Sequence, residues 1–165
     1  MSPGLAGLPL AAPPTSAEVA RWDVEPSVTA ARALRYEVLA RWGDHRPDDA
    51  QPTSMSRLAL VLTELVTNAV QHGDGLIDVT LGRTPAGWLV VVSELPAPSD
   101  RPVPTPTSWR RSDLDAPEPG GRGLSIVVAI STRCGWQRQA GELAVWAEVP
   151  VNTGQAIAVS HTSVD

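Results

Sequence analysis

Lysine and phenylalanine are absent from this 165-residue chain, and cysteine and tyrosine each occur only once. All 13 basic residues are therefore arginines. The absence of lysine excludes three kinds of site: the phosphate loop that ends in Gly-Lys-Ser/Thr, the strand lysine of eukaryotic-type kinases, and the Schiff-base lysine. Any phosphate that this chain binds must be held by other groups.

Other classes of protein are excluded by what the chain has little of. A single cysteine, Cys134, excludes an intramolecular disulfide and a cysteine-rich zinc site. No apolar run approaches the roughly 18 residues that a membrane-spanning helix needs. The first 16 residues contain four prolines and no positive charge, unlike a signal peptide, so we expect a cytoplasmic protein. The net charge of −5 argues against direct nucleic-acid binding, which needs a basic face.

Hydrophobic patterning predicts one domain with a tail at each end. Residues 1–16 are rich in Pro, Ala and Gly without an apolar period, so we expect a disordered leader. Residues 152–165 are expected to form a flexible tail. The domain between them, residues 17–151, should be α+β: a two-layer sandwich with helices on one face of a mixed, mostly antiparallel sheet.

The expected elements follow from the spacing of apolar residues and from turn signals. We expect strands at residues 18–24, 76–84, 87–94, 134–139 and 143–149. The first helix should start near Pro26, bury Ala33 among other residues, and stop at Gly43. The second should begin after Thr53 or Ser54, and the third in the segment of residues 120–132. Residues 95–119 include seven prolines and form either a disordered insertion or a functional lid.

Glu64 and Asn68, in the segment ELVTNAVQHG, stand four residues apart on neighbouring turns of the second expected helix. They fall on the flank of its apolar stripe, where a polar group can face a cleft. A carboxylate and a carboxamide at this spacing can hold a hard cation through oxygen and orient an attacking hydroxyl. A solvent-exposed pair at the helix edge explains the same spacing.

Glycines open the third expected helix, in the segment GGRGLSIV. Glycine lets the backbone approach a phosphate closely, and free N–H groups at the positive end of the helix dipole attract anions. Glycine also serves ordinary turns, so this segment by itself is a weak signal.

In this order, and separated by a proline-rich segment, the two motifs resemble those of the GHKL (Bergerat-fold) ATP-binding superfamily. Within it they are similar to the anti-sigma-factor serine/threonine kinases of actinobacteria. ELVTNAVQHG resembles the N box of this family, and GGRGLSIV its glycine-rich phosphate box. The first helix with its terminal Trp-Gly and the last Val-Trp strand fit the same pattern, so the resemblance covers residues 18–150.

The resemblance implies a role for each matching residue. Asn68 would chelate the Mg²⁺ that bridges the ATP phosphates, and Glu64 would be the general base that orients a partner's serine hydroxyl. His72 would line the phosphate end of the pocket, although the dipole at a helix end explains a histidine there as well. Residues 95–119 would be the ATP lid. The phosphate-binding positions would be Gly121, Arg122, Gly123 and Leu124.

Two positions depart from the family's pattern. Glu94 stands where relatives have the aspartate that binds adenine, and it is one methylene longer. Ala144 stands where relatives commonly have a threonine that helps to hold the base. Each unmade buried hydrogen bond costs about 1–3 kcal/mol. We therefore expect the affinity for ATP to move from the micromolar toward the millimolar range.

The resemblance implies an ATP- and Mg²⁺-dependent serine/threonine kinase and binding switch. It would bind a sigma factor in one state and phosphorylate a STAS-domain anti-anti-sigma partner in the other. Relatives often form homodimers through the face of the first helix and strand. An alternative is a non-catalytic binding module with a degenerate nucleotide pocket. The ATPase region of a sensor histidine kinase fits less well, because the chain has no room for a dimerisation helix pair.

The remaining polar candidates are assigned to structure or solvent. Cys134, in an expected strand, fits a small buried residue better than a reactive thiol. His45 and His161 lie in polar segments without metal-like partners. Three acidic residues of the expected lid should face solvent, namely Asp113, Asp115 and Glu118.

Overall fold

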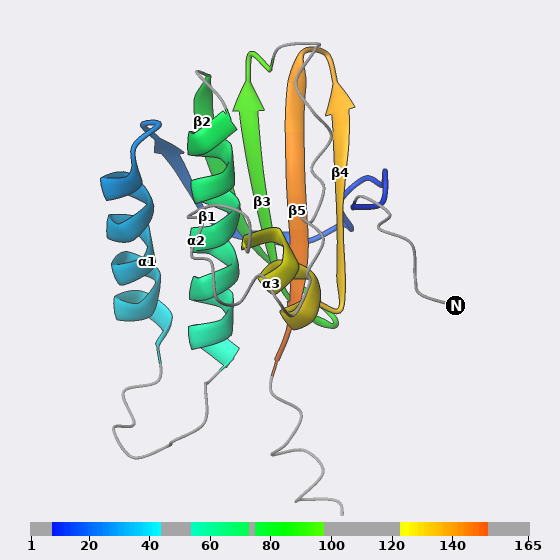
Figure 1. Ribbon diagram of the computed structural model, residues 1–165. Helices are drawn as coiled ribbons and strands as arrows, with labels where there is room; N and C mark the ends of the chain where they lie inside the picture. Colours follow the sequence, from blue (N-terminus) through cyan, green and yellow to red (C-terminus); the bar gives the residue numbers. More distant parts are fainter. Residues whose placement is uncertain (1–7, 44–53, 73–74, 98–122, 152–165) are drawn as a thin grey trace, which may run out of the picture.

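The computed structural model describes residues 8–43, 54–72, 75–97 and 123–151, and the statements below refer to these ranges. Three helices cover one face of a five-stranded sheet (Figure 1). The helices are α1 (Val28–Trp42), α2 (Ser54–His72) and α3 (Gly123–Ile130). The expected α+β class and the two-layer arrangement are confirmed. None of these helices is both long and apolar enough to cross a membrane.

The sheet has the strand order β1-β2-β3-β5-β4, and each neighbouring pair is antiparallel. The strands are β1 (Ala17–Val24), β2 (Leu76–Thr84), β3 (Gly87–Leu95), β4 (Arg133–Gln139) and β5 (Glu142–Pro150). The predicted sheet was mixed, whereas parallel pairing within the described ranges is limited to an isolated bridge between Leu10 and Trp136. β4 is the last strand in this order, so it forms one edge of the sheet.

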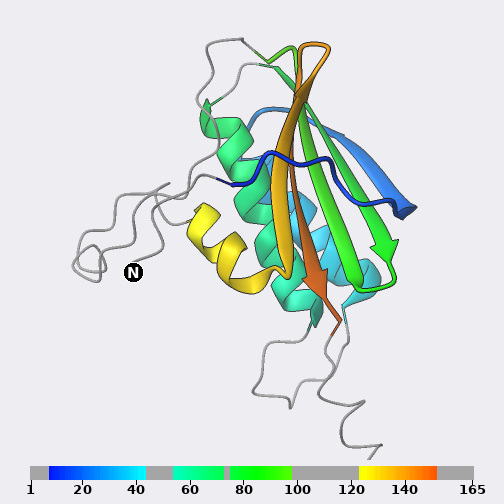
Figure 2. The ribbon, with the colours of Figure 1, turned by 90° about the vertical axis from the view of Figure 1, so that its right-hand side faces the viewer.

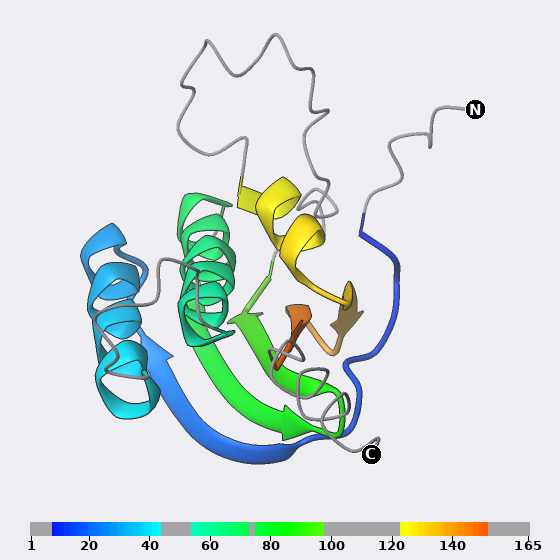
Figure 3. The same ribbon diagram turned by 90° about the horizontal axis from the view of Figure 1, so that it is seen from below.

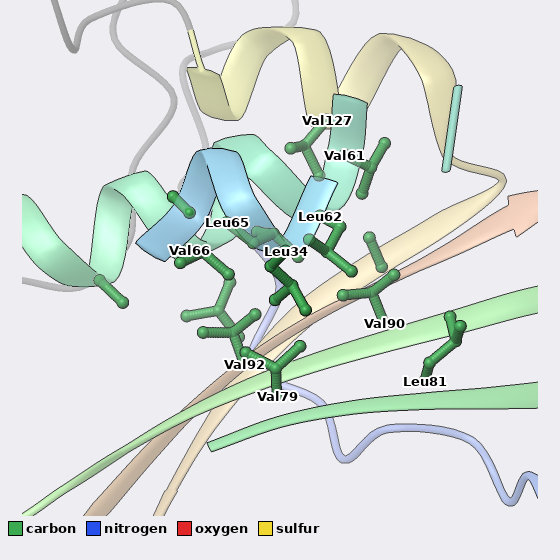
Figure 4. Packing of buried hydrophobic residues seen from close by; sticks show 14 of the residues in the cluster. Leu34, Val61, Leu62, Leu65, Val66, Val79, Leu81, Val90, Val92 and Val127 are labelled. Carbon is green, nitrogen blue, oxygen red and sulfur yellow. The ribbon is translucent and has the colours of Figure 1, made fainter. Parts of the chain in front are cut away.

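Helix α2 is the centre of the hydrophobic core. Its apolar residues recur every three to four positions, so they share one face of the helix, which packs onto the sheet. Figure 4 shows side chains of this face pointing toward Val79 of β2 and Val90 of β3. The buried residues of the predicted stripe are Leu58, Leu62, Leu65, Val66 and Ala69.

Helix α1 starts at Val28, two residues later than Pro26 suggests. Ser27 is its N-cap, and the Ser27 hydroxyl accepts a hydrogen bond from the Ala30 N–H at 3.1 Å. The helix ends as predicted, where the Gly43 N–H donates to the Leu39 carbonyl at 2.8 Å. Its buried residues are Ala31, Leu34 and Val38, whereas Ala33 is exposed, contrary to the prediction. Ala33 lies about 200° around the helix from Ala31 and so faces away from α2.

The leader differs from the disordered segment that its composition predicts. Leu8 is 4% exposed and belongs to the core, and Leu10 pairs with Trp136 of β4. Residues 1–7 and the expected tail, residues 152–165, lie outside the described ranges. The domain boundaries at residues 17 and 151 stay a prediction.

Candidate nucleotide-binding site

The two sequence motifs meet where α2 passes the start of α3. These helices lie side by side in Figure 3 and are in contact. Gly123 is the first residue of α3, and its backbone lies so close to Glu64 that a Cβ atom at position 123 would collide with Glu64 Oε2. The absence of a side chain at position 123 therefore lets the carboxylate lie against the start of α3.

Apolar side chains hold α3 in this position. Leu124 and Val127 are buried, and Figure 4 shows Val127 beside Val61 of α2. The first N–H groups of a helix have no acceptor within the helix, and they carry the positive end of its dipole. The start of α3 therefore offers anion-binding groups next to a carboxylate. Leu124 contributes its side chain to the core.

Burial changes the acidity of Glu64. Burial raises the pKa of the Glu64 carboxyl above its ordinary value, and the positive charge of Arg35 on α1 partly opposes this effect. A carboxylate with a raised pKa is a stronger base once it has lost its proton. Sequence reasoning missed Arg35, because an exposed arginine after a buried leucine is common on helices.

Asn68 lies one turn beyond Glu64 on α2 and is partly buried. The Asn68 side chain offers an oxygen atom, which is the kind of donor that Mg²⁺ prefers. The described ranges contain no group of three His, Cys, Asp or Glu side chains that could hold a metal ion. This donor set fits Mg²⁺, which usually binds one or two protein ligands and takes its other ligands from water and phosphate.

Glu94, the residue expected to bind adenine, lies near the end of β3. Its cross-strand neighbours are Ile77 and Leu143, both of which belong to the core, so Glu94 faces the helices. Only 2% of Glu94 is exposed, and the backbone of Gly75 packs against its side chain. A buried carboxylate oxygen is an acceptor suited to an amino group such as the 6-amino group of adenine.

Ala144 lies on the opposite face of the sheet from Glu94. Its cross-strand neighbour is Ser93, and the core contains Leu143 and Val145 but not Ala144. Side chains alternate along a strand, so Leu143 is the residue of this segment that faces Glu94. The expected loss of affinity through a missing hydroxyl at position 144 therefore has no basis in this pocket.

Several predicted site residues lie outside the described ranges. These are Gly121, Arg122 and the expected lid from residue 98 onward, together with His45 and His161. His72 is the last residue of α2, and its side chain is not described. The chain beyond β3 is described as far as Ala97, whose N–H donates to the Gly141 carbonyl at 2.7 Å.

A buried carboxylate, which sequence reasoning also missed, fixes the other end of α3. Glu148 of β5 is 1% exposed and accepts hydrogen bonds from Arg133 at 3.1 and 2.9 Å. The hydroxyls of Thr84 and Thr132 donate to it at 2.8 and 3.2 Å. These hydrogen bonds, from Arg133 above all, lower the pKa of Glu148. The one signal in the sequence was an acidic residue within an apolar strand.

Comparison with known proteins identifies the family. Residues 23–148 match the family described as histidine kinase-like ATPase domain, which is more than half of the chain. The chain therefore belongs to the histidine kinase-like ATPase domain family, and membership implies ATP binding.

Among solved structures, the chain is similar to the crystal structure of the RsbU and RsbW domains of Rv1364c from Mycobacterium tuberculosis. The two share 18% sequence identity at a TM-score of 0.49. The match covers 80% of this chain and 33% of the other, so this chain spans about a third of that neighbour. No curated protein matches it.

Proposed function

We propose that this chain is an ATP-dependent serine/threonine protein kinase of the anti-sigma-factor type. The observation that carries the proposal is the contact between Glu64 and Gly123, which joins a partly buried carboxylate to the start of α3. A helix start supplies N–H donors for phosphate, and the carboxylate supplies a base for the incoming hydroxyl. Family membership supports ATP as the nucleotide.

Each described residue has one task in this proposal. Glu64 accepts the proton of the attacking serine or threonine hydroxyl, and Asn68 holds Mg²⁺ through its side-chain oxygen. When bound, Mg²⁺ neutralises charge on the phosphates. Glu94 accepts a hydrogen bond from the amino group of adenine. The N–H groups at the start of α3, with Gly123 and Leu124, bind phosphate oxygens.

The proposed partners are a sigma factor and a STAS-domain anti-anti-sigma factor that receives the phosphate. Their support is the resemblance of the two motifs to anti-sigma-factor kinases. We also propose a homodimer through α1 and β1. Its support is the exposed apolar surface on these elements, where Val19 is 41%, Val28 59% and Tyr36 66% exposed.

A phosphoryl-transfer assay tests the kinase proposal. The full chain is incubated with ATP carrying a labelled γ-phosphate, Mg²⁺ and a purified STAS-domain protein. Asn68→Ala and Glu64→Gln should each abolish labelling of the partner, because each removes a group that acts on the phosphate or the hydroxyl. Gln71→Ala is the matched control, since Gln71 is exposed on the same helix. Undiminished transfer by both site variants would disprove the assigned roles.

A second candidate function is a non-catalytic binding module. Glu94 favours it, because this residue is one methylene longer than the aspartate of relatives and its carboxylate is buried. This candidate predicts that the full chain binds a sigma factor or a STAS-domain protein equally well with and without ATP. The kinase predicts that ATP changes the affinity for at least one of them, and pull-down with and without nucleotide separates the two.

A further inference from the structure

Residues 8–16, here called the leader strap, cross the face of the sheet that the helices leave uncovered. Figure 2 shows this dark blue segment passing across β4 toward β1. Pro9 lies against Gly135 of β4, Ala11 accepts from Trp146 of β5, and Ser16 packs on Gly82 of β2. The leader strap thus spans the sheet from one edge almost to the other, and it covers Trp146, which is only 4% exposed.

The strap adds an extended segment to the free edge of β4. The Ala11 N–H donates to the Trp136 carbonyl at 2.9 Å, and the Trp136 N–H donates to the Pro9 carbonyl at 3.0 Å. Two indoles fasten the same segment: Trp136 Nε1 donates to the Leu8 carbonyl and Trp146 Nε1 to the Ala11 carbonyl, both at 2.8 Å. Main-chain pairing with an edge strand plus side-chain anchors is the way in which sheets bind extended peptides.

β4 is shaped for this contact. A Cβ atom at Gly135 would lie 2.9 Å from the Pro9 carbonyl oxygen and 2.9 Å from the Trp146 ring. The missing side chain lets the indole reach past β4 to the strap. At the start of the strap, Leu8 is 4% exposed and joins the core, whereas Leu10 is 72% exposed. Leu8 is therefore the apolar anchor.

The strap fills this surface incompletely. Pro9, Pro13 and Pro14 have no N–H, so they cannot extend the ladder along β4. The segment carries no charged residue that could add an ion pair. An open cavity of about 500 Å³ remains between the strap and the end of α3. Its lining includes Ala11 and Ala12 on one side and Val128, Ser131 and Cys134 on the other.

We propose that β4, Trp136 and Trp146 form a binding site for an extended, uncharged, proline-containing peptide, and that the leader strap occupies this site as an intramolecular ligand. A partner segment with a larger apolar side chain at the position of Ala12 occupies more of the cavity and displaces the strap. The strap holds its place because it is tethered, since a tether gives a weak ligand a millimolar effective concentration. This inference does not depend on nucleotide binding.

Hydrogen exchange of the full-length protein tests whether the strap opens by itself. A displaceable strap opens locally, so the amides of Ala11 and Trp136 should exchange at least 100-fold faster than those of the β3–β5 ladder, after correction for intrinsic rates. Equal protection would overturn the proposal, because the strap would then open only on global unfolding.

A matched pair of variants tests the site itself. Leu8→Glu should release the strap, expose Trp136 and Trp146 and shift the tryptophan fluorescence to the red. Leu10→Glu, the same change at the exposed leucine, should leave the spectrum unchanged. If Leu8→Glu does not fold, as judged by circular dichroism, Trp136→Phe removes the indole bond to Leu8 instead, and faster exchange at Ala11 reports release.

Peptide binding completes the test. A synthetic peptide of residues 8–16, at millimolar concentration, should bind the released variant and reverse the red shift, but should not bind the wild type. The same peptide with Ala12→Leu should bind several-fold more tightly, because the leucine buries additional apolar surface in the cavity. A released variant that binds neither peptide would overturn the proposal, and so would a tighter complex with the alanine peptide.

Discussion

Two opposing effects act on the pKa of the Glu64 carboxyl. Its burial beside α3 raises the pKa of the carboxyl, and the Arg35 guanidinium on α1 lowers it. A general base acts only when it has lost its proton, so the balance of these influences sets the pH at which transfer begins. Arg35 therefore tunes the pKa of Glu64 through its charge, although it lies outside the two sequence motifs.

Replacement of Arg35 changes this balance in a known direction. Arg35→Ala removes the positive charge, so the pKa of Glu64 rises further, and the rising limb of the pH–rate profile should move to higher pH. The plateau rate at high pH should stay within about twofold, because the base itself is unchanged. Rates of phosphoryl transfer from pH 5 to pH 9 measure this.

Arg32→Ala serves as the control for this prediction, since Arg32 is an exposed arginine on the same helix. Its profile should match that of the wild type. An Arg35→Ala profile without a shift would show that Glu64 does not titrate as the base.

At the scale of the element, α3 is fixed at both ends by carboxylates with different tasks. Its first residue, Gly123, touches Glu64. Just beyond its last turn, Thr132 donates to Glu148, which also binds Arg133 and Thr84. The contact with Glu64 places the start of α3 beside the carboxylate. The hydrogen bond from Thr132 to Glu148 fixes the segment that follows α3.

A methyl group added at the start of α3 should reduce phosphoryl transfer without reducing stability. Gly123→Ala places a Cβ atom against Glu64 Oε2, so the carboxylate must turn away. Because this oxygen is at the end of a flexible side chain, and because alanine favours helices, thermal stability should be unchanged or slightly raised. Phosphoryl transfer should fall at least tenfold. Val128→Ala, on the exposed side of α3, should change neither, and a Gly123→Ala variant with full activity would contradict the proposed contact.

The Glu148 cluster should control acid stability. Glu148→Gln keeps the shape but loses charge-assisted hydrogen bonds, so we expect a loss of about 1–3 kcal/mol at pH 7. The folded-state pKa of Glu148 lies below the ordinary value of 4.5, so its contribution is present above that value and is lost as the pH falls through the folded-state pKa. Urea unfolding of both proteins should therefore converge at low pH.

Glu142→Gln provides the comparison, because Glu142 lies at the start of the same strand and is partly exposed. Glu142→Gln should change the free energy of unfolding little at any pH. A Glu148→Gln deficit that stays constant from pH 7 down to pH 3 would show that the carboxylate charge does not carry the stability.

At the scale of the whole molecule, the sequence predicted the order of the elements and the meeting of two motifs. Helix α2 and the hairpins were predictable because their apolar periods are local. The face of the sheet on which Ala144 lies was not predictable, since a shift of one residue in register moves every side chain to the other face. The leader strap was not predictable either, because the indoles that donate hydrogen bonds to it lie more than 120 residues away along the chain.

Nucleotide titration tests the central claim, that the described face of α2, α3 and β3 binds ATP. Calorimetry of the full chain with Mg²⁺ should give a Kd for ATP at or below about 1 mM. GTP should bind at least about fivefold more weakly, because its ring carries an acceptor where Glu94 needs a donor, and an unmade buried hydrogen bond costs about 1–3 kcal/mol. No heat with several millimolar ATP, or equal binding of the two nucleotides, would contradict this account.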